Sequence, residues 1–222
     1  MQKKDCICQE TPHLVLCEGI DAYFFLIWLL DFFKKENKTF NVFKVYDFES
    51  TNKLKQNLRI IASMDGFKQI VRSVSIIRDA EKNAGSACQS IQTALGDNGF
   101  AVPTEPCCQT LGGSPTYPHI RTGFLLFPDC NASPQAGTLE DLCLRILAKT
   151  DAQIVLADAD IALEPYKAQL PRLQKNRLHT YFSLTNEFVS LKIGEAAKAQ
   201  AFRWSTPEIE SLKSFLLEMA GS

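Results

Sequence analysis

The chain has 222 residues, of which 45% are hydrophobic and 22% are charged, a composition typical of a globular protein. Its 24 Lys and Arg residues and 25 Asp and Glu residues leave a net charge of −1. This balance excludes a chain that binds nucleic acid through its overall basic charge, so any such contact must come from a local patch. The length suits one large domain, or one domain with a helical extension.

The eight cysteines include no pair of C-x-x-C motifs and no His partners at zinc spacing. A soft-metal site at Cys6 and Cys8, or at Cys107 and Cys108, is the less favoured alternative to reduced thiols. The first residues lack the apolar core of a signal peptide, and the longest apolar run, residues 22–33, is too short to span a bilayer. We therefore expect a cytoplasmic protein with reduced thiols and no membrane contact.

The chain opens with a strand, an acidic turn and a helix. His13–Cys17 is a short apolar run typical of a strand, and Glu18-Gly19-Ile20-Asp21 joins it to a helical run over residues 22–36. Gly19 permits a tight turn, and Asp21 suits an N-cap or the first helical turn, where the helix dipole favours an acid. Glu18 follows the last strand position, so we expect its carboxylate to point into the crevice above the sheet.

A strand over residues 41–48 and a helix over 52–63 lead to the most informative stretch, S-V-S-I-I-R-D-A-E at residues 73–81. Its apolar part is typical of a strand buried on both faces. Asp79 and Glu81 follow, and at positions i and i+2 of an extended segment they would point at one spot. Two like charges there need a cation, or a proton on one of them. A solvated turn after the strand is the structural alternative.

The remaining pattern predicts a helix over 86–95, strands over 101–106 and 122–127, and helices from 139 onward, including 190–202 and 207–219. Thr138 is the expected N-cap of the helix that starts at Leu139, and Thr206 that of the helix that starts at Pro207. Strands that alternate with helices predict an α/β fold with a mainly parallel, Rossmann-like sheet flanked by helices. We expect residues 1–150 to form this domain, and residues 151–222 to add C-terminal helices packed on it.

Acids thus follow three of the predicted strands: Glu18 the first, Asp79 and Glu81 the central one, and Asp129 the last. Because the carboxyl ends of parallel strands line one crevice, we expect these side chains to converge. Carboxylate oxygens favour Mg²⁺ or Mn²⁺ over zinc, and such an ion is typically shared with a phosphate.

Two of these stretches resemble a known family. L-V-L-C-E-G-I-D followed by a helix, and I-I-R-D-A-E later in the chain, resemble the E-G and D-x-D motifs of the TOPRIM domain. That domain is shared by topoisomerases, bacterial primases, small ribosomal-RNA maturases and the OLD-family nucleases. F-P-D-C-N…G-T-L-E-D-L and the tail G-E-A-A-K-A-Q…W…F-L resemble stand-alone TOPRIM-like proteins related to the OLD nucleases. The resemblance covers nearly the whole chain and implies a TOPRIM-like fold.

The resemblance also implies roles for single residues. Glu18 matches the glutamate that the family uses as general acid or base, and Asp79 and Glu81 match the Mg²⁺-binding pair, with Glu in place of the usual second Asp. OLD-type nucleases generally carry another acid just after the E-G pair; Asp21 is available there, whereas the next residue is Ala22.

Other residues complete the predicted site. Asp129 and Glu140 are candidates for missing metal ligands, and Arg78 and Lys82 flank the central acids and are candidates for contacts with phosphate. Arg78 is equally suited to neutralising one of the neighbouring acids. A second D-x-D, at residues 158–160, lies in a helical pattern and is not assigned to the site. The basic residues at 167, 172, 175 and 177 are interpreted as a solvated helix face, with nucleic-acid contact as the alternative.

Two functional hypotheses follow. The first is a Mg²⁺-dependent nuclease or related phosphoryl-transfer enzyme that acts on DNA or RNA. The alternative is a non-catalytic module with the TOPRIM fold that binds nucleic acid or protein. A third reading, a hydrolase of small phosphoesters, requires a closed pocket in place of an open basic groove. No Walker-type P-loop precedes the sheet, so an ATPase partner of the OLD sort would be a separate chain.

Overall fold

The computed structural model describes residues 10–221. Its centre is a four-stranded sheet of order β2-β1-β3-β4 in which all neighbouring strands are parallel. The strands are β1 (His13–Cys17), β2 (Phe43–Asp47), β3 (Ser73–Asp79) and β4 (Arg121–Phe127). The predicted α/β class and parallel sheet are therefore confirmed.

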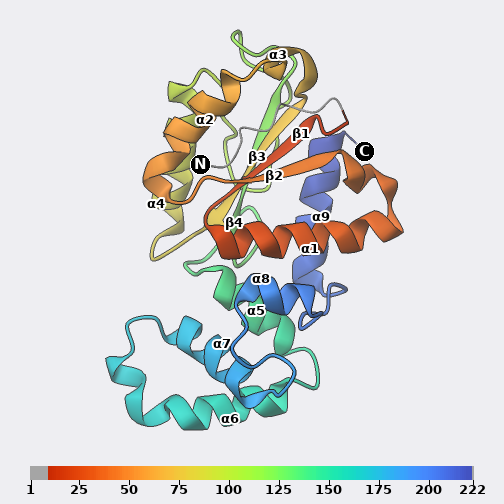
Figure 1. Cartoon of the computed structure of the whole chain (residues 1–222). Helices are drawn as coiled ribbons and strands as arrows, with labels where there is room; N and C mark the ends of the chain where they lie inside the picture. The colour runs from red at the N-terminus through yellow and green to blue at the C-terminus, as the bar shows by residue number, and fades with distance from the viewer. Residues whose placement is uncertain (1–9, 222) are drawn as a thin grey trace.

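Helices cover both faces of the sheet (Figure 1). Alternate strand residues feed two apolar cores: Val15 and Ile77 belong to one core, and Leu16 and Ile76 to the other. The first core receives α1 (Ile20–Glu36), α5 (Leu139–Leu147), α8 (Ile193–Lys198) and α9 (Pro207–Ala220). The second receives α2 (Leu54–Ala62), α3 (Phe67–Ile70) and α4 (Ala84–Asp97), and the 3₁₀ turns η1 (Lys38–Val42) and η2 (Thr51–Lys53) flank β2.

The order of the strands reverses between β1 and β3. From β1 the chain passes through α1 to β2 at one edge, and it returns through α2 and α3 to β3 on the other side of β1. In open parallel sheets, ligands bind at such a point, in the crevice outside the carboxyl ends of the strands. Glu18 follows β1 and Asp79 ends β3, so both residues border this crevice.

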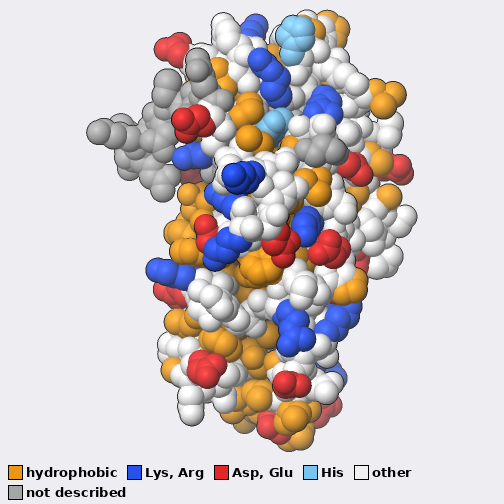
Figure 2. Space-filling model, turned by 90° about the vertical axis from the view of Figure 1, so that its right-hand side faces the viewer, with side chains coloured by type: hydrophobic (Ala, Val, Ile, Leu, Met, Phe, Trp, Pro, Cys, Tyr) orange, Lys and Arg blue, Asp and Glu red, His pale blue; other side chains and the backbone are white. Residues whose placement is uncertain are grey.

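A helical hairpin projects away from the sheet. It consists of α6 (Gln153–Leu163), the 3₁₀ turn η3 (Glu164–Gln169) and α7 (Leu173–Leu184), and we call it the arm. Figure 1 shows the arm below α5 and α8, and α7 packs against α5. Ile154 and Ile161 of α6 are 69% and 73% exposed, and Figure 2 shows hydrophobic side chains gathered over the lower part of the molecule.

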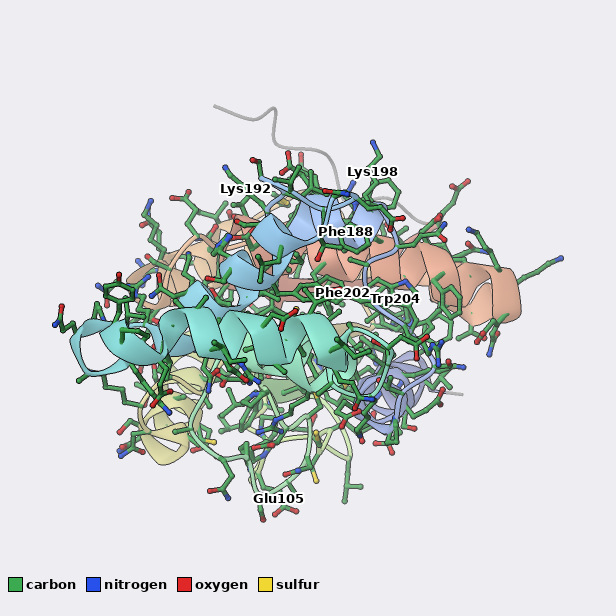
Figure 3. All side chains as sticks on the ribbon, turned by 90° about the horizontal axis from the view of Figure 1, so that it is seen from below. Glu105, Phe188, Lys192, Lys198, Phe202 and Trp204 are labelled. Atoms are coloured by element: carbon green, nitrogen blue, oxygen red, sulfur yellow. The ribbon has the colours of Figure 1, made fainter. Side chains whose placement is uncertain are left out.

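The segment after the arm returns to the sheet domain. Rings of Phe202 and Trp204 lie 5.8 Å apart and contact Phe25 of α1 with centroid distances of 5.8 and 5.2 Å (Figure 3). Helix α8 approaches α1 so closely that a Cβ added at Gly194 would lie 2.4 Å from Phe24 Cβ. None of the helices within residues 10–221 is long and apolar enough to cross a membrane.

Three predicted elements need correction. Residues 101–106 form an irregular connection and not a strand, and the side-chain amide of Gln92 donates to the carbonyls of Pro103 and Thr104 there. Two prolines in this stretch supply no N–H group for a sheet. The strand predicted from residue 41 begins at Phe43 after η1, and the helix predicted over 190–202 is only Ile193–Lys198. The second D-x-D lies in α6, as the helical pattern predicts.

Candidate functional site

Asp79 is the central residue of the site. Its Oδ1 accepts a hydrogen bond of 2.8 Å from the backbone N–H of Leu139, at the start of α5. Burial and the charge of Glu140 raise the pKa of Asp79 to about 8; Glu81 and Glu18 add to the rise, and the Leu139 N–H opposes it. The half-buried carboxyl of Asp79 therefore belongs to an acidic cluster. Such a cluster needs a cation, or a proton on one of its acids, which is the condition expected from the sequence.

Glu81 reaches the same cluster by a route different from the expected one. Its backbone is left-handed, with φ of 57°, and its N–H and C=O each pair with Gly137 at 2.8 Å. The segment after Asp79 therefore leaves the regular extended conformation at Glu81. Both side chains nevertheless line one pocket.

The start of α5 supplies Glu140. Thr138 is the N-cap, as predicted, and Asp141 closes a capping box by accepting from the Thr138 N–H at 2.8 Å. This cap fixes the first turn of α5 against the end of β3. Glu140 then faces Lys175 of the arm, with 3.9 Å between Oε1 and Nζ.

A pocket of about 510 Å³ lies between the sheet domain and the arm. One wall is formed by the end of β3 and the start of α5, and the other by the loop before α7 and the first turn of that helix. The lining residues are Asp79, Glu81, Lys82, Thr138, Glu140, Asp141 and residues 171–175.

Glu18 follows β1 and lies beside Arg78, on the face of the sheet opposite to that of Asp79. Its Oε1 accepts from the backbone N–H of Thr51 at 2.9 Å and from the Thr51 hydroxyl at 2.7 Å. Its Oε2 lies 3.0 Å from Nε of Arg78, as an ion pair that is not aligned as a hydrogen bond, and Arg78 donates to Thr51 Oγ1 at 2.9 Å. Arg78, only 4% exposed, therefore neutralises Glu18 and not a neighbouring central acid, and neither residue lines the pocket.

Asp21 lies in the first turn of α1, as predicted, whereas the N-cap is Gly19, with φ of 86°. Its position relative to the other acids follows from Cys143 of α5. Burial raises the pKa of the Cys143 thiol well above its ordinary value, and the charges of Glu140, Asp21 and Asp79 add to this rise. These three carboxylates therefore lie near enough to the buried thiol for their charges to act on it.

Asp129 does not join the cluster. One of its carboxylate oxygens pairs with Arg145 of α5, and the other accepts from the backbone N–H of Gln135. It does not line the pocket, and its partners give it the role of an anchor for the loop after β4. We therefore remove Asp129 from the predicted metal ligands.

Two residues near the crevice were missed by the sequence reasoning. Asp47 ends β2 and accepts from the backbone N–H groups of Gly19 and Glu49. The sequence predicts that this strand ends at residue 48. With its end at residue 47, Asp47 would have been recognised as a further strand-end acid. Thr51, which holds Glu18, follows an irregular turn and carries no such signal.

The donor chemistry suits a hard cation, but the side chains do not form a closed cage. Within residues 10–221, no three His, Cys, Asp or Glu side chains are grouped closely enough to hold one ion. Mg²⁺ is commonly bound by one or two carboxylates together with water and substrate phosphates, which these residues can provide. The alternative pair Cys6 and Cys8 lies outside the described residues, and burial raises the pKa of Cys107 to about 12.

The fold and the pocket together define an α/β protein with an acidic cluster at the carboxyl end of a parallel sheet. The sequence model of a family described as "Protein of unknown function (DUF3226)" matches residues 12–220, and the chain belongs to this family. Neither the comparison with curated proteins nor the comparison with solved structures gives a match. The TOPRIM resemblance and its chemistry remain predictions.

Proposed function

We propose that the chain is a Mg²⁺- or Mn²⁺-dependent enzyme of the TOPRIM type that hydrolyses or transfers phosphodiesters of DNA or RNA. The observation that carries this proposal is the half-buried carboxyl of Asp79 at the end of β3, whose pKa is raised by burial and by the charges of Glu140, Glu81 and Glu18. Like charges gathered at a buried site are unfavourable unless a cation or a proton balances them. The position beside the reversal in strand order favours a ligand site over a chance cluster.

In this proposal two carboxylates, those of Asp79 and Glu140, hold the ion together with water and the substrate phosphate, and Glu81 lines the same pocket beside them. A bound divalent cation neutralises phosphate charge and orients the scissile group. The backbone N–H of Leu139 keeps the Asp79 carboxylate in place, and the Thr138 cap keeps Glu140 beside it. Asp21, in the first turn of α1, is the candidate ligand for a second ion.

Glu18 retains the role of proton donor or acceptor that the resemblance implies. In the arrangement described above, both of its oxygens are engaged, one by Thr51 and one by Arg78. To move a proton, Glu18 has to leave Thr51 when substrate binds. Asp79 has no such requirement. Its raised pKa means that it holds a proton near neutral pH, and a bound cation would displace that proton.

The test is cleavage of supercoiled plasmid, single-stranded DNA and RNA with Mg²⁺ or Mn²⁺. We expect the wild type to cleave at least one of these three substrates, with a loss of at least about a hundredfold in Asp79→Asn and a comparable loss in Glu18→Gln, the range typical of removed catalytic groups. Asp158→Asn is the matched control, because Asp158 is an exposed acid of α6, and it should cleave as the wild type does. Undiminished cleavage by Asp79→Asn would refute the proposal.

One outcome favours the alternative function. Metal binding by the wild type without cleavage of any of the three substrates would fit a TOPRIM-type binding module. The contacts of Glu18 with Thr51 and Arg78 support this alternative, because they occupy both of its carboxylate oxygens. In either case, a partner of the protein would be a separate chain, either an ATPase of the OLD sort or another protein.

A further inference from the structure

The arm contributes a basic wall to the acidic pocket. Arg172 and Lys175 stand at the start of α7, opposite the acids of β3 and α5, and Lys82 adds a third cation from the sheet domain. Two of these three cations, Lys82 and Arg172, make no side-chain ion pair or hydrogen bond with any residue in the range 10–221. Lys175 is held only by a long contact of 3.9 Å with Glu140. The basic wall is therefore available to a ligand.

The other basic residues of the arm behave differently. Arg177 lies 2.6 Å from Asp160 and also donates to it, and Lys167 lies 3.5 Å from Glu164. Their charges are used within the arm, whereas those of Arg172 and Lys175 face the pocket. Arg172 and Lys175 are open to solvent, as the interpretation of a solvated helix face expects, but they also line the pocket, so the alternative of a contact with nucleic acid is kept for these two residues.

The charge balance of the pocket favours an anion once a cation is present. Four carboxylates and three cationic side chains line it, an excess of one negative charge when all are ionised. One divalent cation on the acids reverses this to an excess of one positive charge. A phosphate group between the two walls would then contact the cation on one side and Arg172 and Lys175 on the other, the arrangement in which charge-assisted hydrogen bonds are strongest.

The size of the pocket limits what can enter. A volume of about 510 Å³ is in the range of small-molecule sites, of roughly 300–1,000 Å³. Specific binding of duplex DNA instead uses an open surface of about 1,000–2,500 Å² of protein. A pocket between the carboxyl end of β3 and a helical arm thus suits one nucleotide unit and not a length of duplex.

We propose that Arg172 and Lys175 of the arm bind the terminal phosphate of a single nucleotide unit, so that the ligand is a phosphorylated strand end or a free nucleotide. This inference rests on the proposed function for the role of the opposite wall. Within the proposed function, this inference assigns the reaction to the end of a strand and not to the interior of a duplex. The phosphate displaces Lys175 from its long contact with Glu140.

The experiment measures binding without turnover, in the Asp79→Asn background and without divalent metal. The substitution leaves Glu81, Glu140 and Asp141 balanced by the three cations that line the pocket, so the negative excess that disfavours an anion is removed without a metal ion. The probes are a short single strand with an internal fluorophore, carrying a 5′-phosphate, a 3′-phosphate or no phosphate, and a closed circle of the same sequence. We expect one phosphorylated strand to bind at least about tenfold more tightly than the unphosphorylated strand and the circle, as hydrogen bonds to charged groups predict. Arg172→Gln with Lys175→Gln should abolish this preference.

The matched control is Lys167→Gln, which removes one exposed charge of the same arm outside the pocket and should keep the preference. Competition by deoxyadenosine 5′-monophosphate distinguishes the two sources of the phosphate: displacement of the probe indicates a free nucleotide, and no displacement a strand end. Equal binding of the circle and the phosphorylated strands, or no binding of any probe, overturns the inference. Because Asp79 is absent from this background, the proposed metal chemistry can fail while the phosphate preference holds, and the reverse.

Discussion

Asp79 gives the protein a pH dependence with a defined sign. The pKa of its carboxyl is about 8 in the folded state, against about 3.9 in an unfolded chain. Between these values the folded state binds a proton that the unfolded state does not, so the contribution of Asp79 to stability falls as pH rises from about 4 to 8. A bound cation at neutral pH has to displace this proton.

Asp79→Asn should therefore stabilise the protein without metal at pH 8, because the amide oxygen still accepts from the Leu139 N–H and carries no charge. We expect its melting temperature to exceed that of the wild type by about 2–4 °C for each kcal/mol gained, with the difference shrinking toward pH 4. Thermal denaturation between pH 4 and 9 measures this. Asp158→Asn is the control and should follow the wild type; parallel pH profiles of Asp79→Asn and the wild type would contradict the account.

The sequence identified Asp79 and Glu140 because strand-end and helix-start acids leave local signals. It did not identify the partners of Glu18, because Thr51 comes from a turn far along the chain and only the packed fold brings it there. Arg78 was assigned to its neighbours in sequence, whereas strand alternation places it on the opposite face from Asp79 and beside Glu18. Roles that depend on strand alternation and pairing were thus less predictable than roles fixed by one element.

At the scale of elements, periodicity and caps were reliable guides. Thr138 and Thr206 occupy the N-cap positions of α5 and α9 as expected, although the Thr206 hydroxyl makes no capping hydrogen bond. Strands β1, β3 and β4 lie where apolar runs predict strands. The failure at residues 101–106 came from counting apolar residues while two prolines removed sheet donors. The predicted helix over residues 190–202 was too long. The apolar residues after α8 lie in a loop, where the rings of Phe202 and Trp204 pack against each other.

The close approach of α8 to α1 gives a stability prediction. Gly194→Ala should lower the free energy of unfolding, because the new methyl would lie 2.4 Å from Phe24 Cβ. Overpacking costs about 1–3 kcal/mol, partly offset by the gain of up to about 1 kcal/mol from helix propensity. Denaturant unfolding measures the difference. Gly112→Ala, where nothing lies within 4 Å, is the control and should unfold as the wild type does; equal stability of both variants would show that α8 does not pack this closely.

At the scale of the whole molecule, two separate parts of the chain make the site. The sheet domain brings Asp79, Glu81 and Glu140 together, and the arm adds Arg172 and Lys175 across the pocket. The acidic half could be expected from strand ends and one helix start. The basic half could not, because the position of α7 beside the pocket depends on its packing against α5, which no local pattern encodes.

The most direct test is calorimetric titration of the protein with Mg²⁺ and Mn²⁺ at pH 7 and pH 8.5. The account predicts binding by the wild type that strengthens at the higher pH, as the proton on Asp79 is lost, and that falls by at least about tenfold in Asp79→Asn and in Glu140→Gln. Asp158→Asn should bind as the wild type does. Binding that is the same in the wild type and in Asp79→Asn, or no binding by the wild type at either pH, would contradict a divalent-cation site at the end of β3.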